Sequence, residues 1–155
     1  GAPFYDVYET ADGRWLSVAA IEPRFYADFA RLLELPASLD RNDRATWPQL
    51  RTAITEAIRR RTRDEWVSAA AGLDACIAPV LTPAEAPTHP QHAARGTFVE
   101  VGGITQPGPA PRFARTPGRI SGPPPAPGEH TDAALTDWGV PGTTVAQWRE
   151  EGAIT

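Results

Sequence analysis

The residue best suited to chemistry is Glu22, which stands in Ile21-Glu22-Pro23 between a predicted strand and a predicted helix. Pro23 suits the first position of a helix, because its ring fixes φ near the helical value and its missing N–H needs no partner there. The Glu22 carboxylate is therefore expected beside the free N–H groups at the helix start. It can serve there as an acid/base group, or it can simply interact favourably with the helix dipole. The residues alone leave both roles open.

Three other groups have residue types that occur in functional sites, and a structural role accounts for each. The arginine run 59–61 could bind phosphate, but cations also suit the C-terminal end of a helix. Cys76 is interpreted as a small buried hydrophobic residue and not as a nucleophile, because no His lies near it in sequence. His89 and His92 could share a helix face, but no nearby acid or thiol set completes a metal site. We therefore expect no metal.

The elements that position Glu22 are a hairpin and a helix. An Asp-Gly turn at 12–13 separates residues 5–10 from residues 15–21, two runs rich in aromatic and β-branched side chains, which is a strong hairpin signal. Both faces of this hairpin are fairly apolar, so a sheet covered on both sides is expected. Apolar side chains then recur at helical spacing over residues 24–33, which predicts a helix.

Further helices and strands are predicted downstream of this first unit. Apolar residues spaced four apart predict a helix starting at Pro48, and the capping-box pattern at 62–65 opens a third helix. Residues 76–81 predict a short apolar strand, and Pro79 within it indicates an edge position or a bulge. Residues 97–101 form the last predicted strand. The predicted fold is therefore α+β, a small antiparallel sheet with an N-terminal hairpin, packed by about three helices.

This α+β domain is expected to cover residues 1–104, after which the composition changes. Eight of the 24 residues from 105 to 128 are proline, so this stretch is predicted to be extended and to contain neither helix nor central strand. The embedded Arg112-Phe113 favours a strap that docks on a surface over a loose linker, because a pure spacer needs no aromatic anchor.

The last part of the chain divides into a helix and a tail. Residues 129–140 predict a short C-terminal helix. Residues 141–155 are expected to be a tail that frays unless Val145 and Trp148 anchor it. The chain has no methionine, even at position 1, and begins with a hairpin whose edge something upstream should cover. We interpret it as a part of a longer protein.

Composition limits the classes of protein that the chain can belong to. Its 155 residues, 41% hydrophobic and 22% charged, fit a soluble globular domain with a core. No apolar run approaches the roughly 20 residues of a membrane span, and a net charge of −4 argues against a general nucleic-acid binder. One cysteine gives no case for an oxidising compartment, so a cytoplasmic protein is expected. All 15 basic residues are arginine, which indicates a GC-rich bacterial genome.

Taken together, the segments resemble the family III CoA-transferase superfamily and, within it, the racemases of 2-methylacyl-CoA thioesters. The resemblance extends over about residues 1–140 and depends on the order and spacing of its motifs. The motifs are Gly1-Ala2-Pro3-Phe4-Tyr5-Asp6 with Ala11-Asp12-Gly13, Ala20-Ile21-Glu22-Pro23-Arg24-Phe25-Tyr26, Asn42-Asp43-Arg44-Ala45-Thr46-Trp47-Pro48, Asp74-Ala75-Cys76-Ile77-Ala78-Pro79-Val80-Leu81, and Pro109-Ala110-Pro111-Arg112-Phe113-Ala114-Arg115-Thr116. The closing Pro127-Gly128-Glu129-His130-Thr131 is typical of the wider superfamily.

The resemblance implies an interlocked homodimer in which a large Rossmann-like domain binds the CoA thioester and a smaller α+β domain completes the active site. This chain is similar to that small domain, followed by the strap and by a helix (129–140) that docks on the large domain. Such racemases act in lipid and fatty acid metabolism. They exchange the α-proton of a 2-methylacyl-CoA without metal or organic cofactor, since CoA belongs to the substrate. Alone, the chain is expected to be inactive.

The resemblance also assigns one catalytic residue. A His supported by an Asp acts on one face of the substrate and a Glu on the other, and the Glu of the Ile-Glu-Pro motif is Glu22 here. The His and Asp belong to the large domain. Neither role is therefore carried over to His89, His92, His130 or any Asp of this chain.

Two alternative functions stay open. A family III CoA-transferase would use a carboxylate nucleophile from the large domain, although Ile21-Glu22-Pro23 favours the racemase. A non-catalytic interaction module, from another class, would bind a partner groove through its proline-rich strap.

Overall fold

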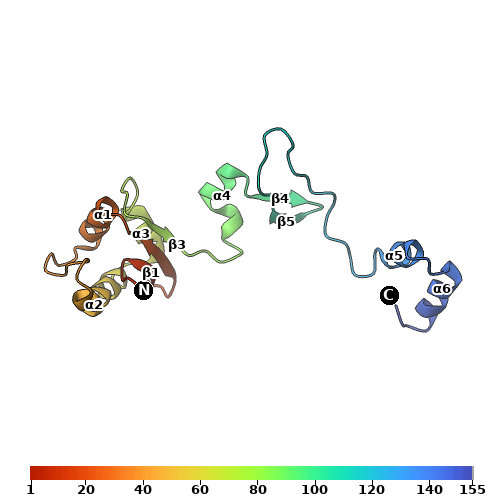
Figure 1. Cartoon of the computed structure of the whole chain (residues 1–155), viewed down its shortest axis with the longest axis horizontal. Coiled ribbons are helices and arrows are strands. Elements are labelled where there is room, and N and C mark those ends of the chain that lie inside the picture. Colours follow the sequence, from red (N-terminus) through yellow and green to blue (C-terminus); the bar gives the residue numbers. More distant parts are fainter. Residues whose placement is uncertain (155) are drawn as a thin grey trace. The chain divides into compact units, whose positions relative to one another are not determined.

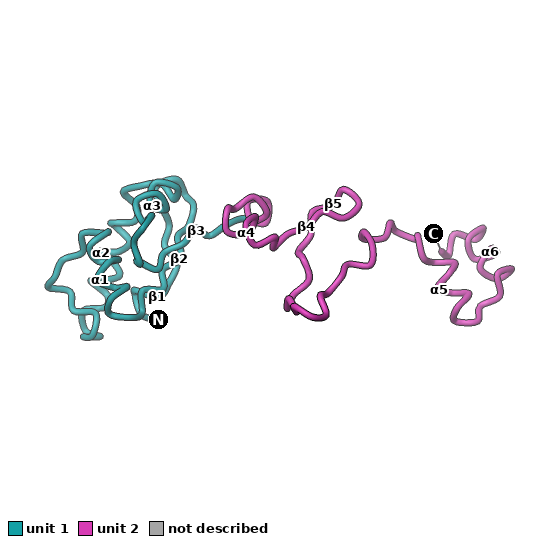
Figure 2. Tube along the Cα trace, turned by 90° about the horizontal axis from the view of Figure 1, so that it is seen from above, with its two compact units in different colours: residues 1–82 teal, residues 83–155 magenta. Residues whose placement is uncertain are grey.

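The computed structural model describes residues 1–154 and divides into two compact units, the first comprising Gly1–Thr82 and the second beginning at Pro83 (Figure 2). The structure has small antiparallel sheets and helices, which confirms the predicted α+β class (Figure 1). The domain boundary expected after residue 104 stays a prediction. Within residues 1–154 no helix combines the length and apolar composition needed to cross a bilayer.

The sheet of the first unit contains three antiparallel strands in the order β1-β2-β3. They are β1 (Tyr5–Glu9), β2 (Trp15–Ala19) and β3 (Ile77–Pro79). The predicted hairpin is confirmed, and Gly13 adopts φ +70° in its loop, a conformation that glycine reaches without a steric penalty. Pro79 lies on an edge strand as expected, since β3 pairs only with β2 in this sheet.

Three helices pack in the first unit, as predicted. They are α1 (Pro23–Leu33), α2 (Trp47–Ile58), which follows a 3-10 turn at Arg44–Thr46, and α3 (Arg63–Ala69). The α3 capping box is present, because Thr62 and Glu65 exchange side-chain and backbone hydrogen bonds. Helix α1 ends at Leu33, as the predicted range 24–33 indicated, because Glu34 adopts the left-handed conformation at φ +56° and closes the helix.

The core of the first unit lies between one face of the sheet and the three helices. Side chains at alternate strand positions point into it, which is the period-2 pattern of a half-buried sheet. The helices contribute stripes at helical spacing. The buried hydrophobic residues are Phe4, Tyr8, Leu16, Val18, Ala20, Phe29, Leu33, Leu50, Ile54, Ala57, Ile58, Trp66 and Ala75.

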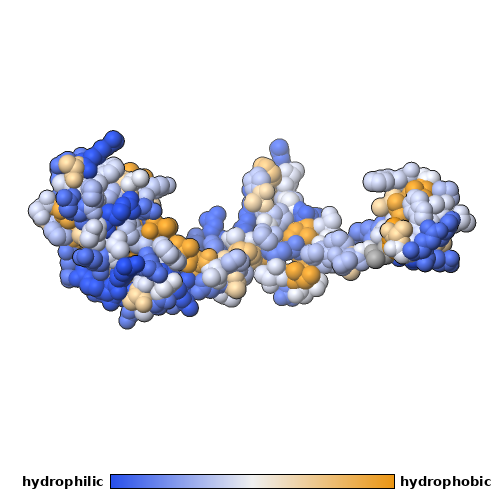
Figure 3. Space-filling view, turned by 90° about the horizontal axis from the view of Figure 1, so that it is seen from below, coloured by the Kyte–Doolittle hydropathy of each residue, from blue (hydrophilic) through white to orange (hydrophobic). Residues whose placement is uncertain are grey.

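The opposite face of this sheet is exposed in the first unit, so the covering layer that its apolar side chains predict stays a prediction. Tyr5, Val7 and Trp15 are 58%, 49% and 45% exposed, and Val80, which pairs with Trp15 through a backbone hydrogen bond, is 41% exposed. Figure 3 shows hydrophobic residues at the surface of this unit among hydrophilic ones. The helices of the unit pack on one face only. We call these four residues the open sheet face.

The second unit begins with short elements and a hairpin that the sequence did not predict. After a 3-10 turn (Ala86–Thr88) and α4 (Pro90–Arg95), β4 (Phe98–Val101) pairs with β5 (Ile104–Pro107). The predicted strand is therefore confirmed. The proline-rich stretch, expected to contain neither helix nor central strand, begins with three residues of β5, which is an edge strand. A two-stranded sheet has only edge strands, so Pro107 is tolerated at its end.

The C-terminal part of the second unit contains two helices, α5 (Thr131–Asp137) and α6 (Gly142–Glu150). Helix α5 confirms the short helix predicted within 129–140. The tail is helical over most of its length, and Val145, one of its two expected anchors, is only 4% exposed. Trp138 directly after α5 is 84% exposed.

Candidate functional site

The strand-to-helix junction after β2 places Glu22 at the N-cap of α1, as the sequence predicted. Its backbone is extended, with φ −72° and ψ 143°, and Pro23 begins the helix. The Glu22 carbonyl accepts the first helical hydrogen bond, from the Tyr26 N–H at 2.9 Å. Its side chain is exposed and makes no capping hydrogen bond. The carboxylate is thus not used to cap the helix and stays available to react with a ligand.

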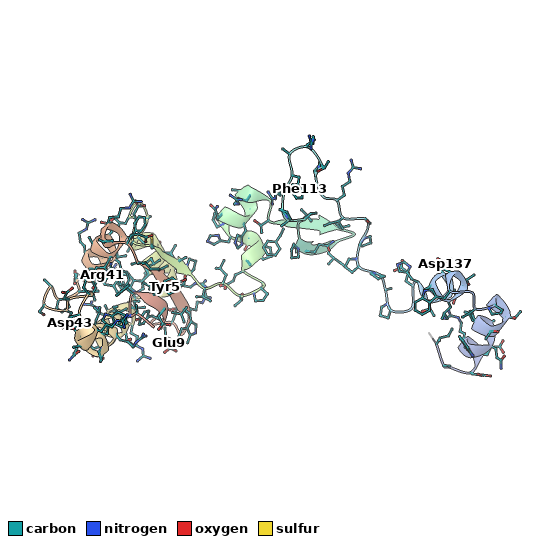
Figure 4. The ribbon with its side chains drawn as sticks, in the orientation of Figure 1. Tyr5, Glu9, Arg41, Asp43, Phe113 and Asp137 are labelled. Carbon is teal, nitrogen blue, oxygen red and sulfur yellow. The ribbon has the colours of Figure 1, made fainter. Side chains whose placement is uncertain are left out.

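The backbone leading to Glu22 is fixed on both sides. The buried Ala20 donates its N–H to the Phe4 carbonyl at 3.0 Å. On the other side, the Arg41 guanidinium donates to the carbonyl of Ala20 at 3.4 Å and to the carbonyl of Ile21. Arg41 lies on the connection between α1 and α2 (Figure 4). The residue carrying the carboxylate is therefore held by parts of the chain far apart in sequence.

Cys76 is exposed in the structure, which corrects the expectation that it is a buried hydrophobic residue. Its φ of +50° is unusual for a residue other than glycine. Cys76 is the last residue of the loop before β3. Its carbonyl accepts a hydrogen bond from the Ala19 N–H at 2.9 Å, which brings it beside the strand that leads to Glu22.

The groups around Cys76 define the electrostatics of this end of the sheet. Partial burial of the thiol raises its pKa, the carboxylates of Glu22 and Asp74 raise it further, and the Arg24 guanidinium lowers it. A raised thiol pKa disfavours the nucleophilic thiolate at neutral pH. The structure therefore brings Cys76 close to the candidate carboxylate but does not activate it.

The arginine run and the histidines have structural contacts. Arg59 pairs with Glu9 at 2.9 Å, Arg60 donates to the Leu33 carbonyl at 3.1 Å, and Arg61 lies 4.7 Å from the Trp66 ring. The rings of His89 and His92 are 5.4 Å apart, and His92 contacts the Ala86 carbonyl through Nδ1. Across residues 1–154 no group of three or more His, Cys, Asp or Glu side chains is arranged to hold a metal ion.

Two features of this site escape sequence reasoning. The contact of Arg41 with the junction connects residues about 20 positions apart, and no local pattern marks it. The proximity of Cys76 to Glu22 depends on the pairing of β2 with β3, whose partners lie 61 positions apart in the Ser17–Ala78 pair. Only the folded arrangement brings these residues together.

Sequence comparison identifies the family to which these elements belong. Residues 1–131 match CoA-transferase family III. The chain is a member of this family. The chain is similar to an alpha-methylacyl-CoA racemase of Mus musculus, 39% identical over 146 residues, and to one of Homo sapiens, 37% identical over 147 residues. Each match covers 90% of this chain but only 38% and 37% of the mouse and human proteins, so the chain spans less than two fifths of their length.

A further similar sequence and two solved structures extend the comparison. A CaiB/BaiF CoA-transferase family protein of Caenorhabditis elegans is 32% identical over 111 residues, which cover 71% of this chain and 32% of that protein. Crystal structures of a Mycobacterium tuberculosis protein and of a CaiB/BaiF family protein from Brucella suis both have a TM-score of 0.62. They are 23% and 20% identical, and the matches cover 83% and 86% of this chain and 38% and 37% of theirs. This similarity shows a common fold.

Proposed function

We propose that this chain is the small-domain part of a racemase that inverts the α-carbon of 2-methylacyl-CoA thioesters, with Glu22 as the acid/base group on one face of the substrate. The proposed enzyme acts in the cytoplasm, in fatty acid and lipid metabolism. The observation that carries the proposal is the exposed Glu22 carboxylate at the start of α1, in a chain 39% identical to an alpha-methylacyl-CoA racemase.

The reaction needs two groups, because inversion removes the α-proton on one face and delivers a proton on the other. Glu22 removes the proton from one enantiomer and returns it in the reverse direction. A carboxylate that makes no capping hydrogen bond is free for both steps. The second group, a His supported by an Asp, belongs to the large domain, so the 155-residue chain alone is inactive and CoA is bound elsewhere.

Apolar side chains exposed on both units support the proposal that this chain contacts a partner domain. The open sheet face presents two aromatic and two β-branched side chains, and in the second unit Phe113 and Trp138 are 57% and 84% exposed. Apolar side chains clustered at a surface are typical of interaction sites. We propose that the large CoA-binding domain covers the open sheet face, and that the strap and α5 return to a large domain in an interlocked homodimer.

The test is Glu22→Gln in the complete enzyme, which keeps the shape and the hydrogen-bonding capacity of the side chain but removes the proton acceptor. We expect racemisation to fall about 10²–10⁴-fold. The melting temperature should hardly change, because Glu22 is exposed and makes no capping bond. Glu56→Gln, on the exposed surface of α2, is the matched control and should keep full activity.

Isotope exchange separates the two faces. Glu22→Gln should still exchange the α-proton of the enantiomer served by the large-domain base while failing to invert it. Racemisation is measured from each enantiomer separately. Full racemisation in both directions by this variant would show that Glu22 is not an acid/base group and has only a structural role.

A family III CoA-transferase is the second candidate, favoured by the match of residues 1–131 to that family and by the C. elegans relative. Its reaction moves CoA from a thioester donor to a free carboxylic acid. Incubation of the complete enzyme with a labelled acceptor acid and an acyl-CoA distinguishes the two reactions, because a racemase forms no labelled thioester.

A further inference from the structure

We infer that Arg41 is a positioning residue for Glu22, because its guanidinium clamps the two carbonyls that immediately precede that carboxylate. The inference rests on the proposed role of Glu22 and adds a residue from a separate loop to the same site. It requires that Arg41 contact the junction, that Arg41 itself be fixed, and that the contact control where Glu22 points.

The contact with the junction uses two nitrogens of one planar group. Arg41 Nη1 donates to the Ala20 carbonyl at 3.4 Å, and Nη2 donates to the Ile21 carbonyl. The fixed fork of a guanidinium can satisfy two neighbouring acceptors at once, which a lysine ammonium on a flexible stem does less well. The two carbonyls are therefore held by the same rigid group.

Two aromatic rings hold the guanidinium in place. Its central carbon lies 4.3 Å from the centre of the Phe4 ring and 4.6 Å from that of Tyr26, and these two rings meet edge to face at 5.7 Å. A cation over an aromatic face is attracted by the ring. The backbone of both aromatic residues also bonds to the junction, Phe4 through Ala20 and Tyr26 through the Glu22 carbonyl. Arg41 thus completes a closed set of contacts around Glu22.

The loop that carries Arg41 is anchored at its other end. Trp47 at the start of α2 donates its indole N–H to the Arg41 carbonyl at 2.8 Å, and its ring packs edge to face on Phe4 at 5.8 Å. The Thr46 hydroxyl donates to the Asp40 carbonyl at 2.7 Å. Both the backbone and the guanidinium of Arg41 are therefore held, so its side chain can fix the position of the junction backbone.

The expected consequence is kinetic. An acid/base group must lie within hydrogen-bond reach of the proton that it moves, and a displacement of about 1 Å can cost roughly 10²-fold in rate. Removing Arg41 leaves the Ala20 and Ile21 carbonyls without the guanidinium and loosens the backbone at Glu22. We expect kcat for inversion to fall about 10–100-fold with little change in KM, because Glu22 acts in the transition state.

The experiment compares four variants in the complete enzyme. Arg41→Met removes the charge but keeps an apolar stem. Arg41→Lys keeps a cation between the rings without the fork and should lose about threefold to tenfold. Arg44→Met is the matched control, because Arg44 lies on the same loop with its guanidinium 5.5 Å from the Trp47 ring, and we expect wild-type rates. Glu22→Gln supplies the reference for complete loss of the group.

A double variant tests whether Arg41 acts through Glu22. Arg41→Met combined with Glu22→Gln should be no slower than Glu22→Gln alone, since a positioning effect vanishes with the group that is positioned. Like Glu22→Gln, Arg41→Met should retain α-proton exchange of the enantiomer served by the other base. Additive losses in the double variant, equal loss of exchange from both enantiomers, or wild-type kcat in Arg41→Met and Arg41→Lys would each overturn the inference.

Amide hydrogen exchange in the 155-residue chain gives a readout independent of activity. We expect faster exchange at Ala20 and Tyr26 in Arg41→Met than in Arg44→Met, because their amides bond within the clamped junction. If Glu22→Gln were fully active while the Ala20 and Tyr26 amides exchanged faster in Arg41→Met, the proposed function would fail. The structural role of Arg41 at the junction would still hold. If Glu22→Gln were inactive and both Arg41 variants normal, only this inference would fail. Should Arg41→Met not fold, the Arg41→Lys rates decide.

Discussion

Arg51 on α2 pairs with Asp6 on β1, with Nη1 2.6 Å from Oδ2. A second hydrogen bond reaches Asp6 from the Val7 N–H at 2.9 Å, while Arg51 also donates to the Gly1 carbonyl at 3.0 Å. The pair therefore joins the start of the chain, the first strand and the second helix, three segments that contribute to the core of the first unit.

This pair predicts an acid-dependent contribution to stability. The hydrogen bond from Arg51, then that from Val7, lowers the pKa of Asp6 below its usual value near 3.8. Its stabilisation is present above that pH and is lost as the pH falls through the lower folded-state pKa, because the folded state resists protonation. Asp6→Asn should flatten the dependence of the unfolding free energy on pH below about pH 4. Urea unfolding between pH 2 and 6 measures this, and an unchanged slope would contradict it.

Tyr8 predicts a change at the alkaline end. Burial raises the pKa of its phenol to about 12, and the hydroxyl donates to the Pro3 carbonyl. Since the folded state keeps the proton, stability is full below pH 10 and falls as the unfolded chain ionises between about pH 10 and 12. Tyr8→Phe should cost about 1 kcal/mol at pH 7, from the lost hydrogen bond, and should lose less stability on going to pH 11. A parallel alkaline loss in both proteins would show that Tyr8 is not its source.

The exposed thiol of Cys76 predicts slow labelling under native conditions. Its exposure allows complete reaction with iodoacetamide in the folded chain, whereas its raised pKa keeps the thiolate scarce at pH 7. We expect the native rate to be below that of a short peptide containing cysteine, and to rise as the pH passes the ordinary thiol pKa. If iodoacetamide labelled Cys76 only after the chain unfolds, the thiol would be buried and this prediction would be wrong.

The open sheet face predicts separate effects on folding and on assembly. Val7→Thr and Trp15→Thr should change the stability of the 155-residue chain by only about 0.5 kcal/mol, as expected for exposed positions. In the complete enzyme the same changes should weaken contact with the large domain and lower the melting temperature. Val67→Thr, at a 37% exposed apolar residue on α3, is the control and should affect neither. Equal effects of all three variants would exclude this face as the contact surface.

Local signals in the sequence determined the elements and the place of Glu22. The Asp-Gly turn, the proline at the start of α1 and the capping box at Thr62 each act over a few residues, so the hairpin, the helix starts and the position of Glu22 at their junction are readable from neighbours alone. The proline content likewise predicted an extended segment, although pairing with β4 turned its first residues into β5.

Only the tertiary structure decided which surfaces and which distant residues surround Glu22. The exposure of Cys76, the uncovered face of the sheet and the helical tail depend on which segments pack together, and several competing arrangements satisfy the same local pattern. The Arg41 clamp is the sharpest case. Its guanidinium reaches carbonyls about 20 residues earlier because Phe4, just before β1, and Tyr26 on α1 bring their rings to one place. Backbone carbonyls are the same in every residue, so sequence carries no mark of which ones a side chain will bind.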